Sequence, residues 1–100
     1  MSETYARQID RKIARVTLRD PKSRWGSCSE QGALMYSWRL ALAPTEIQDY
    51  VAAHEVAHLQ EFNHSRYFWR IVDDLCPDYA EYRAWLRAKG PELHAIRFEP

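Results

Sequence analysis

The chain has 100 residues, of which 46% are apolar and 13% aromatic, and its 14 basic and 14 acidic side chains cancel. This composition predicts a single globular domain over residues 1–100 with one modest core. No apolar run approaches membrane-spanning length and no signal peptide is visible, so we expect a soluble cytoplasmic protein that does not enter a membrane.

Charge and cysteine placement add two further expectations. Residues 1–27 carry seven basic side chains against three acidic ones. Such a cluster is more often a solvated face than a binding site, so any contact with nucleic acid should be weak. Cys28 and Cys76 lack the C-x-x-C spacing of a redox or metal motif. We expect them to be reduced and to pack as small apolar side chains.

The first half of the chain predicts a short helix followed by strands. Residues 1–12 have weak helical character. The β-prone Val16-Thr17-Leu18 indicates a strand that ends at Asp20-Pro21. The small and basic residues 22–29 fit no regular helix, and Gln31-Gly32 is typical of a turn. Residues 33–42 alternate between apolar and polar side chains over most of their length, which predicts one or two further strands.

A helix is predicted from Thr45, because Thr45-Glu46-Ile47-Gln48 matches a capping box; Pro44 is an alternative first helical residue. This helix contains His54-Glu55-Val56-Ala57-His58. Residues four apart share a helix face, so the two histidines can point at one position. The glutamate lies about 100° round the helix from His54 and can reach a water there. This pattern is that of a zinc protease, with two histidine ligands and a glutamate as general base.

The alternative is an amphipathic helix whose histidines are ordinary core or surface residues. Two observations favour a metal. Three of the four histidines, at positions 54, 58 and 64, fall within eleven residues. Apolar residues also cover most of the helix circumference, so its polar side chains need partners: Ile47, Val51, Ala52, Val56, Leu59 and Phe62.

His64 cannot join this site on a straight helix. Six residues beyond His58 correspond to about 600° of rotation and about 9 Å of rise. The chain should therefore turn near residues 61–63, where Asn63 tolerates a left-handed stop. Ser65 should then cap a third helix. Cys76-Pro77-Asp78 breaks it, and a last helix runs from about residue 78 to 89 and stops at Gly90-Pro91, leaving 91–100 as a tail.

Several short motifs of this sequence occur in the same order in a known protein family. The chain resembles the YgjP-like family of small zinc metallopeptidases, which is related to the SprT/Spartan-type protease domain. The resemblance covers about residues 13–90. It is carried by Arg24-Trp25-Gly26-Ser27-Cys28-Ser29, Trp38-Arg39-Leu40, Ala43-Pro44, Asp49-Tyr50-Val51, His54-Glu55-Val56-Ala57-His58, Asn63-His64-Ser65 and Phe68-Trp69.

The resemblance implies that His54, His58 and His64 bind Zn²⁺ and that Glu55 is the catalytic base. It implies zinc-dependent hydrolysis of peptide bonds in a protein or peptide substrate. The expected fold is α+β: a small three-stranded antiparallel sheet beside the active-site helix, with two further C-terminal helices, in a monomer. Two features depart from the family. Ser37 stands where an asparagine is usual, and family members are longer at the N-terminus, so the chain is either a short member or a catalytic core.

Other arrangements remain open. In gluzincin-type enzymes a glutamate on a later helix is the third ligand, and Glu81 has suitable spacing. Metzincins fit less well, because they place glycine where this chain has Glu61 and need a later methionine.

A second electrophile, in addition to the zinc ion, could come from Tyr67, Arg39 or His94. In a non-catalytic zinc module, His94 or Cys28 would be the fourth ligand. A nucleic-acid-associated adaptor is the remaining alternative.

Overall fold

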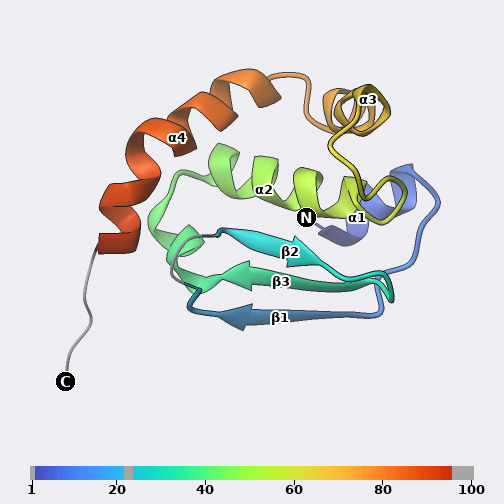
Figure 1. Ribbon diagram of the computed structural model, residues 1–100, viewed down its shortest axis with the longest axis horizontal. Helices are drawn as coiled ribbons and strands as arrows, with labels where there is room; N and C mark the ends of the chain where they lie inside the picture. Colours follow the sequence, from blue (N-terminus) through green and yellow to red (C-terminus); the bar gives the residue numbers. More distant parts are fainter. Residues whose placement is uncertain (1, 22–23, 96–100) are drawn as a thin grey trace.

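The computed structural model describes residues 2–21 and 24–95 and has an α+β fold (Figure 1). The elements follow in the order α1 (Ser2–Gln8), β1 (Arg15–Arg19), β2 (Gly26–Cys28), β3 (Ala33–Ser37), the 3₁₀ helix η1 (Trp38–Leu42), α2 (Thr45–Ala57), α3 (Arg66–Leu75) and α4 (Tyr79–Ala95). The short N-terminal helix and the predicted strands at residues 16–18 and 33–37 are therefore present, whereas β2 lies in the segment 22–29, for which the sequence had predicted no strand.

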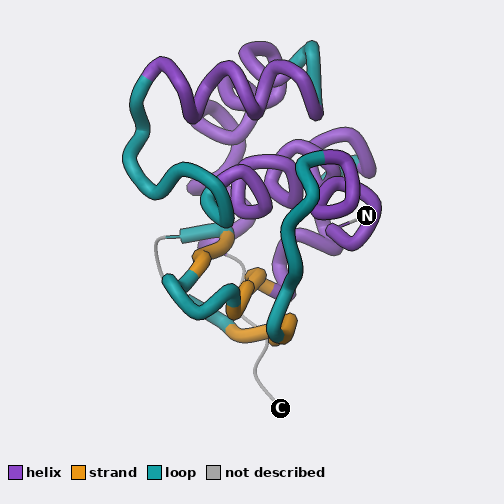
Figure 2. Tube along the Cα trace, turned by 90° about the vertical axis from the view of Figure 1, so that its right-hand side faces the viewer, coloured by secondary structure: helices purple, strands orange, loops and turns teal. Residues whose placement is uncertain are grey.

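The three strands form one layer, and the helices lie on one side of it (Figures 1 and 2). Helix α2 lies between the sheet and the pair α3 and α4. Most of its length is buried, as its apolar circumference predicts. The core contains residues from both layers: Leu34 and Tyr36 of β3, Val51, Ala53 and Val56 of α2, and Phe68 and Val72 of α3.

The sheet is mixed, so the prediction of an antiparallel sheet was wrong. Its order is β1-β3-β2; β3 runs parallel to β1 and antiparallel to β2. The tight turn at residues 29–32 makes β2 and β3 an antiparallel hairpin. The chain also reverses between β1 and β2, but β3 inserts between them and consequently points the same way as β1.

The alternating segment 33–42 is a strand only in its first half. After Ser37 the chain enters η1, where the Ser37 hydroxyl accepts a hydrogen bond from the Arg39 backbone N–H at 3.2 Å. A serine side chain that bonds a backbone N–H two residues ahead favours a turn over continued strand. The Arg39 side chain then joins η1 to two other parts of the chain, since its Nε donates to Asp20 at 2.8 Å and its Nη1 to the Leu93 carbonyl at 3.1 Å.

Helix α2 begins at Thr45 as predicted, but the capping box is not formed. Pro44 is the N-cap and provides no side-chain hydrogen bond. Gln48 instead donates from Nε2 to the Ala43 carbonyl at 3.1 Å, which ties the helix to the preceding loop. Proline cannot donate a backbone hydrogen bond, so its position at the start of a helix costs little.

The third helix has the predicted start: the Ser65 hydroxyl accepts from the Phe68 backbone N–H at 3.3 Å. The last helix does not stop at Gly90-Pro91 but continues to Ala95. Gly90 is buried against Trp25, whose ring atoms would lie 3.3 Å from an added Cβ. The glycine thus allows a close packing contact, where the sequence pattern had suggested a helix end. The rest of the predicted tail, residues 96–100, lies outside the described residues.

In the described part of the chain, no helix is both long enough and apolar enough to cross a membrane.

Candidate metal centre

Two of the three candidate histidines are placed by the end of α2. His54 lies in its last turn, and His58 is the C-cap residue immediately after Ala57. The two rings face the same side of the helix with their centroids 5.1 Å apart. The spacing of four residues therefore brings the imidazoles together as predicted from helix geometry.

The third histidine returns to this face because α2 ends early. From His58 onward the backbone makes tight turns, in which His58 N–H bonds the Glu55 carbonyl and Leu59 N–H the Val56 carbonyl. Helix α2 thus ends before the predicted turn at residues 61–63. Asn63 does not adopt a left-handed conformation; among the described residues other than glycine, only Asp10 has a positive φ. The chain bends at Asn63 without a left-handed residue, and His64 lies beside His54 and His58.

The three histidines could together hold one metal ion. One ring nitrogen from each lies within 4.8 Å of the others. The Nε2 atoms of His54 and His64 are 3.4 Å apart. Two imidazoles bound tetrahedrally to zinc, with Zn–N distances of about 2.0–2.1 Å, have nitrogens about 3.3–3.4 Å apart. The donor set and this separation fit zinc.

Neighbouring groups orient the rings. His58 donates from Nδ1 to the Glu61 carbonyl at 3.1 Å, which leaves the Nε2 lone pair available. The Tyr50 hydroxyl lies 3.4 Å from Nδ1 of His54. The buried Phe68 ring packs under the cluster, stacked on His58 with centroids 4.3 Å apart. Hydrogen bonds and packing together restrict the direction in which the lone pairs point.

Electrostatics favour neutral imidazoles in this cluster. Burial, with a smaller effect from the two neighbouring histidines, lowers the pKa of His54 to about 3. Burial also lowers the pKa of His58, although its bond to the Glu61 carbonyl opposes that shift. A neutral imidazole is the form that binds a metal. At neutral pH these two rings are therefore already in the ligand form.

Glu55 is buried beside the histidines and is only 7% exposed. Burial raises its pKa from 4.5 to about 7, and the positive charge of Arg24 partly offsets this effect. The side chain packs against β2 at Gly26, where an added Cβ would lie 2.9 Å from Glu55 Cγ and 3.0 Å from its Oε2. Glycine at position 26 thus makes room for the carboxylate.

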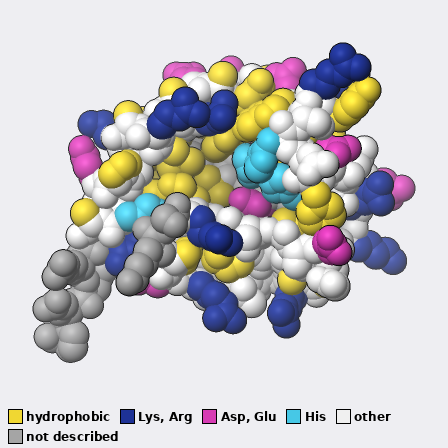
Figure 3. Space-filling view, in the orientation of Figure 1, with side chains coloured by type: hydrophobic (Ala, Val, Ile, Leu, Met, Phe, Trp, Pro, Cys, Tyr) yellow, Lys and Arg dark blue, Asp and Glu magenta, His cyan; other side chains and the backbone are white. Residues whose placement is uncertain are grey.

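These groups border one pocket of about 280 Å³. It is lined by Gly26, Ser27, Cys28, His54, Glu55, His58, Phe62 and His64. Figure 3 shows histidine side chains gathered beside a hollow on this face, with an acidic side chain visible within it. Among the described residues, Glu55 is the only one that lines the pocket with a carboxylate. The arrangement can hold a metal ion and place a carboxylate with a pKa near neutrality next to it.

The alternative ligand Glu81 lies elsewhere. It is exposed and lines a different pocket, together with residues of the first turn of α2 such as Glu46 and Ile47. The histidines are at the opposite end of that helix. The structure therefore does not bring Glu81 to the histidine cluster.

The three candidate electrophiles do not line the histidine pocket. Tyr67 is 55% exposed and contacts Arg66. Arg39 pairs with Asp20. His94 packs on Trp25, with ring centroids 4.1 Å apart.

Cys28 does line the pocket, but its thiol donates to the Ser29 carbonyl at 3.5 Å. Burial, with a smaller contribution from Glu55, raises its pKa to about 11, which opposes the thiolate form that binds metals. It is not among the described donor atoms that gather within 4.8 Å. The other cysteine, Cys76, is buried in the core as expected.

Tyr50, Gly26 and Phe68 are parts of the site that the sequence interpretation did not assign. Tyr50 precedes His54 by four residues on the same helix, so helix periodicity could have indicated their contact. Gly26 comes from the sheet and Phe68 from α3, and no local pattern pairs either with α2. Their roles depend on how the elements pack.

The model of the YgjP-like family, described as a metallopeptidase domain, matches residues 1–89. No curated protein matches the chain. A solved structure, that of the metallopeptidase zymogen of Pyrococcus abyssi abylysin, is similar with a TM-score of 0.77 and 23% identity over 88% of this chain and 90% of that one. At this identity the likeness concerns the fold. The family match spans most of the chain, which therefore belongs to the YgjP-like family of metallopeptidase domains.

Proposed function

We propose that the protein is a zinc-dependent peptidase in which His54, His58 and His64 bind Zn²⁺ and Glu55 is the general base. The observation that carries this proposal is the meeting of three imidazole nitrogens within 4.8 Å in a pocket that Glu55 also lines. Membership of a metallopeptidase family supports the same reaction class.

Zinc is the metal that we assign to this donor set. Imidazole also suits copper, iron and nickel, but three protein ligands with an open fourth position are typical of catalytic zinc. When bound, Zn²⁺ would act as a Lewis acid on the scissile carbonyl and lower the pKa of a water toward about 7. The bond from His58 Nδ1 to the Glu61 carbonyl would keep that ring in the ligand tautomer.

Glu55 would transfer a proton from the attacking water to the leaving amine. In the metal-free site the pKa of Glu55 is about 7, and the positive charge of a bound Zn²⁺ would favour the carboxylate form that accepts a proton from the attacking water. The same carboxyl can then give that proton to the amine that leaves as the peptide bond breaks. Gly26 positions this side chain, because a larger residue there would displace it.

A non-catalytic zinc module is the alternative from another class. Structural zinc sites are closed by four protein ligands. Among the described donor atoms, the cluster contains the three histidines and neither Cys28 nor His94. The carboxylate that does border the pocket belongs to Glu55. This arrangement favours an enzyme acting on a protein or peptide substrate, which we propose works as a monomer.

The Glu55→Gln variant tests the proposal. It should keep one zinc ion per chain by elemental analysis but cleave an unfolded protein such as casein at least about 10²-fold more slowly. Glu46→Gln changes an exposed carboxylate on the first turn of the same helix and is the matched control, with unchanged activity. Zinc loss in Glu55→Gln, or full activity, would contradict the role proposed for Glu55.

A further inference from the structure

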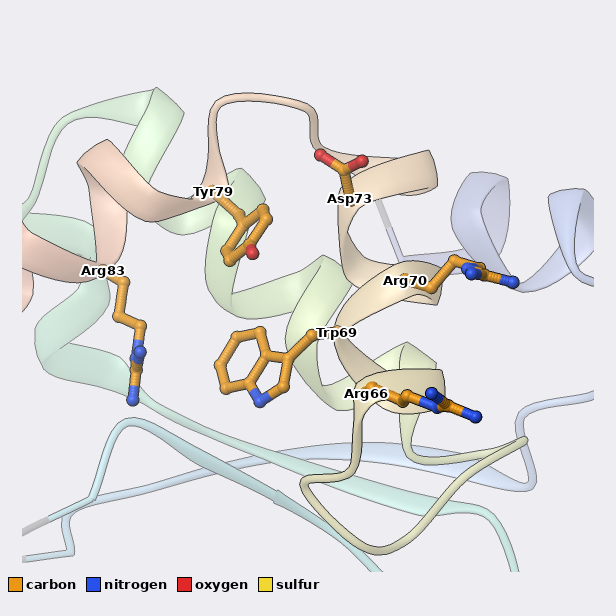
Figure 4. A pocket seen from close by; sticks show the side chains of 6 residues that line it. All are labelled: Arg66, Trp69, Arg70, Asp73, Tyr79 and Arg83. Atoms are coloured by element: carbon orange, nitrogen blue, oxygen red, sulfur yellow. The ribbon is translucent and has the colours of Figure 1, made fainter.

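A second pocket, of about 620 Å³, lies between α3 and the start of α4 (Figure 4). It is an open depression with three arginines, two aromatic rings and one carboxylate in its wall. The lining residues are Arg66, Trp69, Arg70, Asp73, Tyr79 and Arg83.

The two aromatic rings and one arginine form the middle of this pocket. Trp69 of α3 and Tyr79 of α4 stack with centroids 5.4 Å apart and planes inclined by 24°. The Arg83 guanidinium carbon lies 4.7 Å from the Trp69 ring centroid. Figure 4 shows Arg83 extending alongside Trp69 from α4, whereas Arg66 and Arg70 project from α3 and point away from the two rings. The contact with Trp69 places the Arg83 guanidinium beside the stacked rings of Trp69 and Tyr79.

The pocket carries an excess of positive charge that the described part of the chain does not neutralise. Its wall contains three arginines against the single carboxylate of Asp73. Within residues 2–21 and 24–95, no carboxylate lies within ion-pair distance of Arg66, Arg70 or Arg83. A guanidinium that packs on an aromatic ring and has no carboxylate partner among the described residues, as Arg83 does on Trp69, suits a carboxylate from outside the chain.

The pocket adjoins the histidine cluster through Trp69. The Trp69 ring centroid lies 5.7 Å from that of His54 and 6.1 Å from that of His64. An extended peptide advances about 3.3 Å per residue. A substrate held at the histidines would thus reach the Arg83 side of Trp69 within about three residues of its scissile bond.

We propose that this pocket binds an acidic side chain of the peptide substrate, with Arg83 as its main partner and Trp69 as the surface between that side chain and the metal centre. This inference rests on the proposed peptidase function and adds a preference for Asp or Glu near the cleaved bond. A peptide is favoured over nucleic acid because the pocket is a single depression beside the metal centre, which can take one acidic side chain, whereas nucleic-acid binding depends on basic groups that contact many successive phosphates.

Binding tests the proposal independently of cleavage. The zinc-loaded Glu55→Gln protein is titrated with fluorescent peptides in which one Glu is moved through successive positions, each paired with a peptide that carries Gln instead. For at least one position, the Glu peptide should bind about tenfold more tightly at low salt. Adding Arg83→Gln should abolish this preference, and Arg83→Glu should reverse it in favour of a Lys peptide.

Arg87→Gln is the matched control, because Arg87 is an exposed arginine on the same helix that does not line the pocket. It should leave the preference for Glu intact. Equal binding of Glu and Gln peptides at every position, or a preference that survives Arg83→Gln, would overturn the proposal. Tighter Arg83-dependent binding of a single-stranded oligonucleotide than of any Glu peptide would overturn the assignment to peptides.

Cleavage separates this proposal from the function on which it rests. In the zinc-loaded protein with Glu55 intact, the preferred Glu peptide should have about tenfold higher kcat/KM than its Gln partner, and Arg83→Gln should remove the difference with zinc content unchanged. Equal cleavage of the pair would contradict the acidic preference and leave the peptidase function standing. Failure to cleave either peptide would contradict the peptidase function, and the binding comparison would still decide what the pocket recognises.

Discussion

The Nε2 atoms of His54 and His64 lie 3.4 Å apart although ten residues separate them in the chain. A continuous helix would turn these side chains in different directions. The approach depends on the end of α2 at Ala57 and on the tight turn that follows. If the two nitrogens share a zinc ion, the turn is part of the metal site.

His64→Ala should therefore weaken zinc binding at least about 100-fold, because a direct ligand matters more than the supporting groups whose loss costs about 10–100-fold. Zinc that binds only the folded protein stabilises it, so the increase in Tm on adding zinc should shrink as well. A competitive chelator titration and thermal unfolding would measure both effects.

Glu81→Ala is the comparison for that experiment. Glu81 belongs to α4 and lies beside the first turn of α2, at the end of that helix opposite to the histidines. The variant should therefore retain nearly unchanged zinc affinity. The opposite pattern, with zinc lost in Glu81→Ala and kept in His64→Ala, would mean that the ligand set is that of a gluzincin.

Gly26→Ala should reduce peptidase activity at least about tenfold with zinc still bound. The new Cβ would lie 2.9 Å from Glu55 Cγ and 3.0 Å from the Met35 carbonyl, so the carboxylate or the strand must move. Overpacking of this kind costs about 1–3 kcal/mol in the free energy of unfolding. Steady-state kinetics and urea unfolding would separate the two effects.

Gly90→Ala is the control for Gly26→Ala, because it adds the same methyl group at a glycine that packs against Trp25 rather than Glu55. It should change stability without removing activity. Full activity in Gly26→Ala would show that β2 does not position Glu55.

The raised pKa of Glu55 predicts a pH effect on the stability of the zinc-free protein. Its folded pKa of about 7 lies above the ordinary value of 4.5. The stability associated with the protonated carboxyl is therefore fully present below about pH 4.5 and is lost as pH rises through 7. Glu55→Gln cannot ionise, so it should gain about 1–3 kcal/mol relative to the original chain between about pH 5 and 8.

Urea unfolding of both zinc-free proteins in chelator would measure that difference. His54 and His58 are present in both proteins, so their own lowered pKa values largely cancel in the comparison. A difference that does not change with pH would contradict a raised pKa for Glu55.

Local sequence signals predicted the parts of the site that lie on one element. Helix periodicity placed His54 and His58 on a common face, and the Ser65 cap correctly marked the start of α3. The turn that returns the chain toward His64 was expected near residues 61–63, and the chain bends at Asn63, but α2 already ends at Ala57 and Asn63 is not left-handed. The family resemblance, rather than spacing, was needed to select His64 as a ligand.

Features that depend on packing between distant segments were not predictable in this way. The parallel pairing of β1 with β3 depends on which strand occupies the middle of the sheet, and alternation alone does not encode that order. Gly90-Pro91 has the composition of a helix end, yet contact with Trp25 makes Gly90 an interior residue of α4. The place of Gly26 beside Glu55 likewise follows from the packing of β2 on α2.

Nucleic-acid binding should be weak and strongly dependent on salt. The basic excess is local to residues 1–27, and the whole chain has no net charge. Titration with single- and double-stranded DNA should show any binding at low salt lost near physiological ionic strength, about 0.15 M. Tight binding at that salt concentration would instead support the nucleic-acid-associated adaptor.

The most direct test of the metal centre is a crystal structure of the zinc-loaded protein with anomalous diffraction measured on both sides of the zinc absorption edge. We expect one zinc peak at about 2.0–2.1 Å from a ring nitrogen of each of His54, His58 and His64, with the Glu55 carboxylate nearby but not bound to the metal. A peak bound by Glu81, by Cys28 or directly by Glu55, or the absence of zinc at the three histidines, would contradict the site that we propose.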